Sequence, residues 1–214
     1  MPAHQWNSIF HTEDSINSVK QKQFPTKKKK NDIMTILKSK FQPIQVPNVS
    51  IPQFVFEKNF GSKAALIDGH TGLTLTYEQV RGLVDRVSKN LHHDYAFRKG
   101  QVFAIMLPNH PYYAPLLNGV LTAGGVATTV NPVYTREELH HQLKDSGARL
   151  IVTIPLFLDN LISALPGTKI EAVFVLSQDA IPQKQGAKLL SANLLFKPPS
   201  NNAPLNVQID PKKD

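Results

Sequence analysis

The chain has 214 residues, a formal net charge of +8 and no cysteine. This length suits one large domain with tails, and the lack of cysteine excludes a disulfide framework, an iron–sulfur centre and a cysteine nucleophile. Residues 1–40 hold eight lysines against three acids. The basic balance therefore indicates a charged tail and not a binding face for nucleic acid, which we do not expect as a partner.

Residues 1–45 are predicted to be a disordered basic tail, because they are polar and lack a sustained apolar period. No apolar stretch typical of a secretory signal occurs near the start, so an intracellular location is expected. Within the tail, Lys27, Lys28, Lys29 and Lys30 follow one another directly. Such a run is compatible with nuclear import or with contact to an anionic surface, and equally with a simple solvated segment.

Regular structure is predicted from about residue 46, after an extended, proline-containing lead-in. Residues 64–76 read as a β-hairpin around the turn 68–72. Thr76, with Gln79 three residues later, forms a capping box that predicts a helix start. An apolar stripe then follows at helical spacing: Val80, Leu83, Val84, Val87 and Leu91.

From residue 99 onward, strands and helices are predicted to alternate with short connections. The predicted strands are 102–107, 126–130, 149–153 and 171–176, and the predicted helices are 108–122, 135–146 and 155–165. We expect the strand 126–130 to be buried, and Pro115 to kink its helix unless it falls in the first turn. This alternation predicts an α/β fold with a mostly parallel sheet flanked by helices. The predicted domain spans 46–198, and 199–214 reads as a proline- and asparagine-rich linker or chain end.

The segment 101–135 carries no Asp, Glu, Lys or Arg and could be mistaken for a membrane span. A span needs about 20 predominantly apolar residues. Prolines crowd one end of this segment, a glycine pair divides it, and Asn and Thr dilute it. No transmembrane segment is therefore predicted.

Glycine-rich phosphate-binding motifs are absent from the sequence. The pair Gly124-Gly125 precedes a predicted strand, whereas the dinucleotide fingerprint follows one. Gly61-Ser62-Lys63 lacks the first glycine and the preceding strand of a P-loop. These features argue against a stand-alone α/β nucleotide binder.

Histidine pairs and acidic residues give no convincing metal site. His92-His93 and His140-His141 are adjacent pairs, so their side chains diverge by about 100° on a helix. Glu137 and Glu138 fall in the first turn of a predicted helix, where acids suit the helix dipole.

Polar side chains at the carboxyl ends of the strands are the best-placed candidates for ligand contact. By this criterion His110 and Asn131 are the candidates, whereas Asn109 and Thr135 are expected to cap helices. No constellation of nucleophile and base is recognisable. We therefore assign no catalytic, cofactor-binding or metal-binding residue to this chain.

Three segments nevertheless resemble a known family: "LTYEQV" (75–80), the stretch 102–153 and "VFVL" (173–176). The most specific portion is "NPVYTREEL" (131–139) followed by "SGARLIVT" (146–153). These segments look like the N-terminal part of adenylate-forming (AMP-binding) enzymes, in the branch of 4-coumarate–CoA ligases, fatty acyl–CoA synthetases and firefly luciferase. The resemblance covers about 46–214. It implies an incomplete N-terminal domain whose "LTYEQV" and "LTAGGVATTVNP" motifs belong to the scaffold.

The resemblance implies an acid–CoA ligase, which activates a carboxylic acid with ATP and magnesium and transfers the acyl group to CoA. The family's phosphate-binding loop, ending in Gly-x-Pro-Lys, is expected just after "QIDPKKD", and its catalytic lysine lies further downstream. This chain is thus expected to be inactive by itself, with no cofactor of its own. The alternative is a short non-enzymatic isoform with a binding or regulatory role. The resemblance is compatible with a cytoplasmic or peroxisomal location, and the lysine run with a nuclear one.

Overall fold

The computed structural model describes residues 39–181 and 184–213. The chain divides into two units, Met1–Gln45 and Val46–Asp214. In the first unit, residues 39–45 form neither helix nor strand. The greater part of the predicted tail, with Lys27–Lys30, lies outside the described residues.

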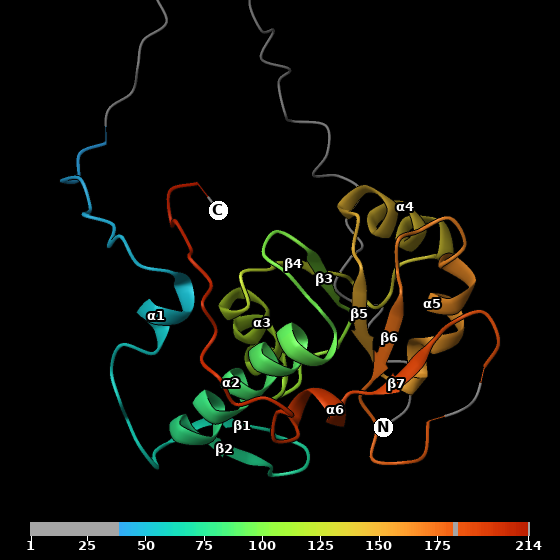
Figure 1. The fold of residues 1–214 in the computed structure, drawn as a ribbon, viewed down its shortest axis with the longest axis horizontal. Helices are drawn as coiled ribbons and strands as arrows, with labels where there is room; N and C mark the ends of the chain where they lie inside the picture. Colours follow the sequence, from blue (N-terminus) through green and yellow to red (C-terminus); the bar gives the residue numbers. More distant parts are fainter. Residues whose placement is uncertain (1–38, 182–183, 214) are drawn as a thin grey trace, which may run out of the picture. The chain divides into compact units, whose positions relative to one another are not determined.

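The second unit is built on a five-stranded parallel sheet (Figure 1). The strands are β3 (Val102–Ile105), β4 (Val126–Thr129), β5 (Leu150–Thr153), β6 (Ala172–Val175) and β7 (Leu189–Ser191). Their order in the sheet is β4-β3-β5-β6-β7, and Phe103 of β3 stands opposite Ala127 on one side and Leu150 on the other. The predicted α/β fold with a mostly parallel sheet is confirmed, because helices connect most successive strands.

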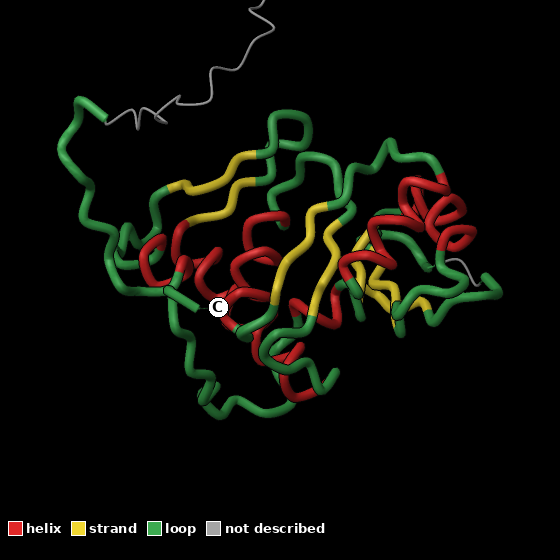
Figure 2. The backbone as a smooth tube through the Cα atoms, turned by 90° about the horizontal axis from the view of Figure 1, so that it is seen from above, coloured by secondary structure: helices red, strands yellow, loops and turns green. Residues whose placement is uncertain are grey.

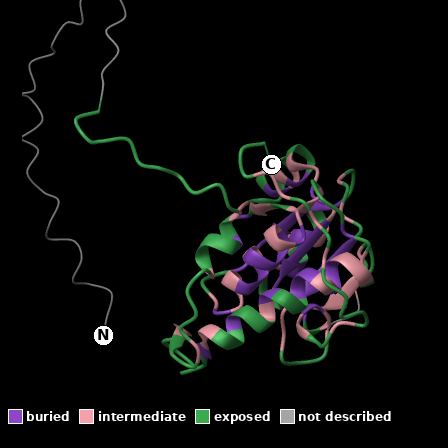
Figure 3. Cartoon of the chain, turned by 60° about the vertical axis from the view of Figure 1, so that its left-hand side comes forward, coloured by how far each residue is buried: buried purple, intermediate pink, exposed green. Residues whose placement is uncertain are grey.

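Helices cover both faces of the sheet because successive side chains of a strand point to opposite faces. The helices are α2 (Tyr77–Asp94), α3 (Tyr113–Thr122), α4 (Arg136–Ser146), α5 (Leu158–Ala164) and α6 (Asn193–Phe196). Phe103 and Ile105 join one core with α2, α3 and α6, whereas Ala104 and Met106 join another with α4 and α5. Figure 2 shows the helices around the strands, and Figure 3 shows the buried residues gathered in the centre of this unit.

The hairpin and the helix after it form as predicted. Strands β1 (Ala64–Ile67) and β2 (Thr74–Thr76) pair antiparallel around the turn. Asp68 closes the turn, since its Oδ1 accepts from the backbone N–H of His70 at 2.8 Å and of Thr71 at 3.0 Å. Both halves of the Thr76–Gln79 capping box are present.

The α3 helix begins five residues later than predicted, at Tyr113. Its N-cap residue Tyr112 makes no side-chain capping bond, so the prediction that Asn109 caps this helix is wrong. Pro115 therefore falls in the first turn, where the missing N–H has no partner to lose. Among the described residues, no helix is both long and apolar enough to cross a bilayer.

Strand β4 is at the edge of the sheet, so the expectation of a buried strand at 126–130 is wrong. Val126 is 50% exposed, and Thr129 is exposed as well. Small and β-branched residues occur in edge strands and in interior strands alike. The residue pattern therefore does not show whether a strand has one neighbour or two, which is decided by the order of the strands in the sheet.

Three short elements were not predicted: α1 (Ile51–Val55), β7 and α6. Ser50 and Gln53 make a complete capping box for α1, within the predicted extended lead-in. Residues 199–209 contain no helix or strand. The first part of this stretch nevertheless lies beside α2, where the Lys89 ammonium donates to Asn202 Oδ1 at 2.7 Å (Figure 1).

Candidate functional site

The strand order places a topological switch point between β3 and β5. The connection after β3 runs to β4 on one side of it, and the connection after β4 returns across β3 to β5 on the other side. In open parallel sheets, ligands approach the carboxyl ends of strands at such a point. The loops after β3, β4 and β5 are thus the first place to look for a functional site.

His110 lies in the loop after β3 and is held by its own backbone. Its Nδ1 accepts from the backbone N–H of Tyr112 at 3.1 Å, and the two rings stack with centroids 5.3 Å apart. Desolvation lowers the pKa of His110, against a smaller opposing effect of the Asp68 carboxylate. Since Nδ1 acts as an acceptor, the neutral ring carries its proton on Nε2.

Asn131 and Thr135, after β4, have structural partners. The Asn131 Oδ1 accepts from the backbone N–H of Val133 at 3.2 Å, which closes a turn. Thr135 caps α4 with Glu138 three residues on, as predicted, and the helix ends at Gly147 in the left-handed conformation. The structure therefore places His110 and Asn131 at the carboxyl ends of the strands, as predicted. Each side chain accepts a hydrogen bond from a backbone N–H two residues further along.

Thr153 is a polar residue at this edge that the sequence reasoning missed. It ends β5, is fully buried, and its hydroxyl has no hydrogen-bond partner among the described residues. The signal was a single polar residue closing an otherwise apolar strand. A hydroxyl that is buried without a partner costs free energy. In this respect Thr153 differs from His110 and Asn131, whose side chains accept backbone N–H bonds.

The histidine pairs serve different purposes. His140 Nδ1 bonds the backbone oxygen of Ala164 at 2.9 Å and so ties α4 to α5. The rings of His92 and His93 stand edge to face, 5.0 Å apart, at the end of α2. Desolvation, and then the positive charges of Arg98 and His93, lower the pKa of His92. Within residues 39–181 and 184–213, no group of three or more His, Cys, Asp or Glu side chains is placed so that it could hold a metal ion.

The glycine pair is a packing device. Gly124 has φ +76° and a Cβ there would lie 2.6 Å from Val207 Cγ1, while a Cβ on Gly125 would lie 2.3 Å from Phe97 Cε1. The Gly124 oxygen accepts from the N–H of Gly100 at 2.9 Å. Both positions therefore require glycine, because Val207 approaches Gly124 and the Phe97 ring approaches Gly125. The pair lies before β4, away from the switch point.

Comparison with protein families and known proteins gives a consistent result. Residues 55–209 match the family model described as AMP-binding enzyme. The chain is 38% identical over 129 residues to 4-coumarate–CoA ligase 3 of Arabidopsis thaliana, covering 59% of this chain and 23% of that protein. It is 32% identical over 193 residues to a probable 4-coumarate–CoA ligase 1 of Dictyostelium discoideum, covering 84% and 34%.

Solved structures of the same fold include two that cover most of this chain. A long-chain-fatty-acid–CoA ligase from Archaeoglobus fulgidus superposes with a TM-score of 0.66 at 21% identity, covering 83% of this chain and 35% of that one. A luciferase-like enzyme from the mealworm Zophobas morio gives 0.64 at 18%, covering 76% and 38%. The chain thus spans about a quarter to a third of the length of the curated relatives cited here. It belongs to the AMP-binding enzyme family, and it covers only a part of the length of its relatives.

Proposed function

We propose that this chain is part of an acid–CoA ligase. Such an enzyme joins a carboxylic acid to AMP from ATP, with magnesium, and then transfers the acyl group to CoA. The observation that carries the proposal is the family match over residues 55–209, together with relatives that are 4-coumarate–CoA ligases. Further support comes from fold neighbours: an anthranilate CoA ligase in complex with anthranoyl-AMP, and MatB with ATP bound.

We further propose that residues 1–214 alone do not catalyse adenylate formation. Phosphoryl chemistry depends on groups that stabilise charge developing on phosphate oxygens. At the carboxyl edge of the sheet, His110 Nδ1 and Asn131 Oδ1 already accept backbone N–H bonds, and Thr135 caps a helix. We infer that the groups that hold ATP, magnesium and CoA belong to parts of the enzyme outside this stretch.

The test is acid-dependent exchange of radioactive pyrophosphate into ATP. Purified 1–214 is incubated with ATP, magnesium and either 4-coumarate or decanoate, beside a 4-coumarate–CoA ligase as positive control. The expected result is exchange no greater than the blank without acid. Exchange above that blank would contradict the inactivity of the chain.

A separate experiment tests the proposal that the chain is part of an acid–CoA ligase. The reading frame that contains these residues is followed beyond the Asp214 codon, and any longer product is assayed in the same way. Acid-dependent exchange by that product supports the ligase. A stop codon directly after Asp214 in an abundant transcript would instead favour a short binding or regulatory protein.

A further inference from the structure

Large apolar side chains face solvent on the short helix α1. Ile51, Phe54 and Val55 are 64%, 57% and 51% exposed. They occupy positions i, i+3 and i+4, so they lie on one face of the helix, which we call the α1 face. Neighbouring apolar side chains exposed together are typical of a surface that contacts another protein or a membrane.

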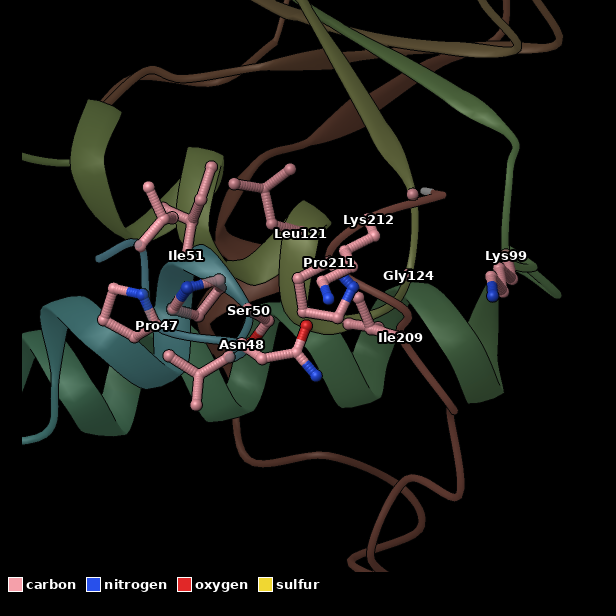
Figure 4. Close-up of a pocket in the computed structure, with 14 residues that line it drawn as sticks. Pro47, Asn48, Ser50, Ile51, Lys99, Leu121, Gly124, Ile209, Pro211 and Lys212 are labelled. Atoms are coloured by element: carbon pink, nitrogen blue, oxygen red, sulfur yellow. The ribbon is translucent and has the colours of Figure 1, made fainter. Parts of the chain in front are cut away.

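The rest of α1 is fixed to the second unit of the chain. Pro52 is buried, and the helix packs against α3. It also borders a cavity, which Leu121 of α3 and Ile209 of the C-terminal stretch line as well (Figure 4). At the end of the helix, the Arg81 guanidinium of α2 donates to the backbone oxygen of Phe56 at 2.9 Å. The α1 face is therefore displayed outward by a helix whose orientation is fixed by its other contacts.

Lysines flank the α1 face in the sequence. Lys58 and Lys63 follow it and are exposed, and the run Lys27–Lys30 precedes it. Over residues 27–63, eight lysines stand against two acids. Lysines beside exposed apolar side chains are typical of segments that lie on an anionic bilayer, because the lysines attract the lipid headgroups while the apolar side chains enter the boundary of the acyl chains.

We propose that the α1 face docks on an anionic lipid bilayer, with Ile51, Phe54 and Val55 at the boundary between headgroups and acyl chains. The lysines of 27–63 supply the electrostatic attraction. Because a span needs about 20 apolar residues and α1 has 5 residues, the helix lies on the bilayer and does not cross it. A second copy of the chain is a poorer occupant, since it brings the same lysines and like charges repel.

The experiment is flotation of purified 1–214 with lipid vesicles, without ATP or an acid substrate. Protein bound to lipid rises with the vesicles, whereas self-associated protein does not. Vesicles of equal parts phosphatidylcholine and phosphatidylserine are expected to bind the chain at least about tenfold more strongly than phosphatidylcholine alone, because each lysine near an anionic surface adds attraction. Added salt should weaken this binding by screening the charges.

A matched pair of variants tests the apolar contact. Phe54→Gln should weaken binding to the anionic vesicles about tenfold, because the ring no longer leaves water on docking. Leu156→Gln also replaces an exposed apolar side chain, in the turn before α5. Since it lies outside the α1 face, it should change binding less than about twofold, the scale of ordinary surface substitutions.

A second pair tests the lysines. Replacing each residue of Lys28–Lys30 by Gln should weaken binding to the anionic vesicles at least about tenfold. Replacing Lys144, Lys169 and Lys188 by Gln makes the same change of net charge at other exposed positions. This control should weaken binding by about twofold at most, because those lysines lie outside the basic segment.

The proposal is overturned if 1–214 does not float with the anionic vesicles, or if the two variants of either pair weaken binding equally. Any longer product of the same reading frame should float as 1–214 does. A longer product that stays below the vesicles while 1–214 rises with them would also overturn the proposal, because the added part of the protein then covers the α1 face.

Discussion

Among the glycines, Gly125 leaves the least room for a side chain, because the Phe97 ring lies against it. A Cβ on Gly125 would stand 2.3 Å from the ring, and the ring itself is fully buried. Neither can yield cheaply, because interiors are packed at crystal-like density. Gly125, which belongs to the glycine pair that was compared with phosphate-binding motifs, is thus required for packing.

A matched pair of glycine variants tests this. Gly125→Ala should lower the free energy of unfolding by about 1–3 kcal/mol, the usual cost of overpacking. A Cβ on Gly82, within α2, would meet no other atom within 4 Å. There Gly82→Ala should raise stability by about 0.5–1 kcal/mol through helix propensity. Chemical denaturation measures both; an equal effect of the two variants would contradict the packing role of Gly125.

His110 should make stability fall as the solution becomes acidic. Its folded-state pKa lies below the ordinary value of 6.5, chiefly through desolvation. As the pH falls below about 6.5, the unfolded chain takes up a proton that the folded chain does not, so folding loses free energy until the folded pKa is passed. Above that window the residue contributes nothing to the pH dependence.

The expected outcome is a shallower loss of stability between about pH 7 and about pH 5 in His110→Asn than in the wild type. His92 acts in the same sense and remains in both proteins. The same substitution at His141, on the exposed side of α4 and away from this loop, is the control for the loss of a histidine. Identical slopes for all three proteins would show that His110 is not responsible.

At the scale of elements, one helix holds the C-terminal stretch in place. The fully buried Asn90 of α2 donates through Nδ2 to the backbone oxygens of Leu195 at 2.9 Å and Lys197 at 3.0 Å. The Arg86 guanidinium, more exposed, reaches the oxygen of Phe196 at 3.2 Å. A buried donor that satisfies two carbonyls stabilises more than an exposed one, because losing it leaves those carbonyls unpaired.

Asn90→Ala should therefore lower stability by about 1–3 kcal/mol and speed amide hydrogen exchange across 195–202. Arg86→Ala, which removes the exposed contact to the same α6 segment, should cost less than about 0.5 kcal/mol. Exchange followed by mass spectrometry resolves the segment. Faster exchange throughout the sheet, without a local maximum at 195–202, would argue against an anchoring role.

For the molecule as a whole, the sheet has an open side. Among the described residues β4 pairs with β3 alone, and Val126 is 50% exposed at that edge. Unpaired strand edges with apolar side chains favour pairing with another chain. We therefore expect purified 1–214 to self-associate and to be poorly soluble.

Val126→Lys should weaken that association about tenfold, as charged residues on natural edge strands do. Val133→Lys places the same side chain at another exposed apolar position, off the strands, and should have little effect. Sedimentation velocity over a range of concentrations distinguishes the outcomes. A wild-type chain that is monomeric and melts cooperatively would count against the open edge as the cause of association.

Much of the fold could be predicted from the sequence because its signals are local. The capping boxes at Thr76 and Thr135, the glycine at 147 and the apolar period of α2 each depend on residues within a few turns of one another. Even α1 has such a signal in Ser50 and Gln53, although the prolines around it favour an extended lead-in. The start of α3 is misplaced by the sequence pattern because Asn109 resembles a cap, whereas the helix begins only at Tyr113.

The sequence by itself therefore determined the succession of strands and helices from β1 to β6, and its motifs carry the family resemblance. Only the tertiary structure decided that β4 is an edge, that Thr153 is buried without a partner among the described residues, and that residues 46–52 meet 209–212 around a cavity. Strand order and cavities arise from contacts between segments distant in the chain. The apolar pattern of a segment does not encode those contacts, because it is the same whichever distant segment packs against it.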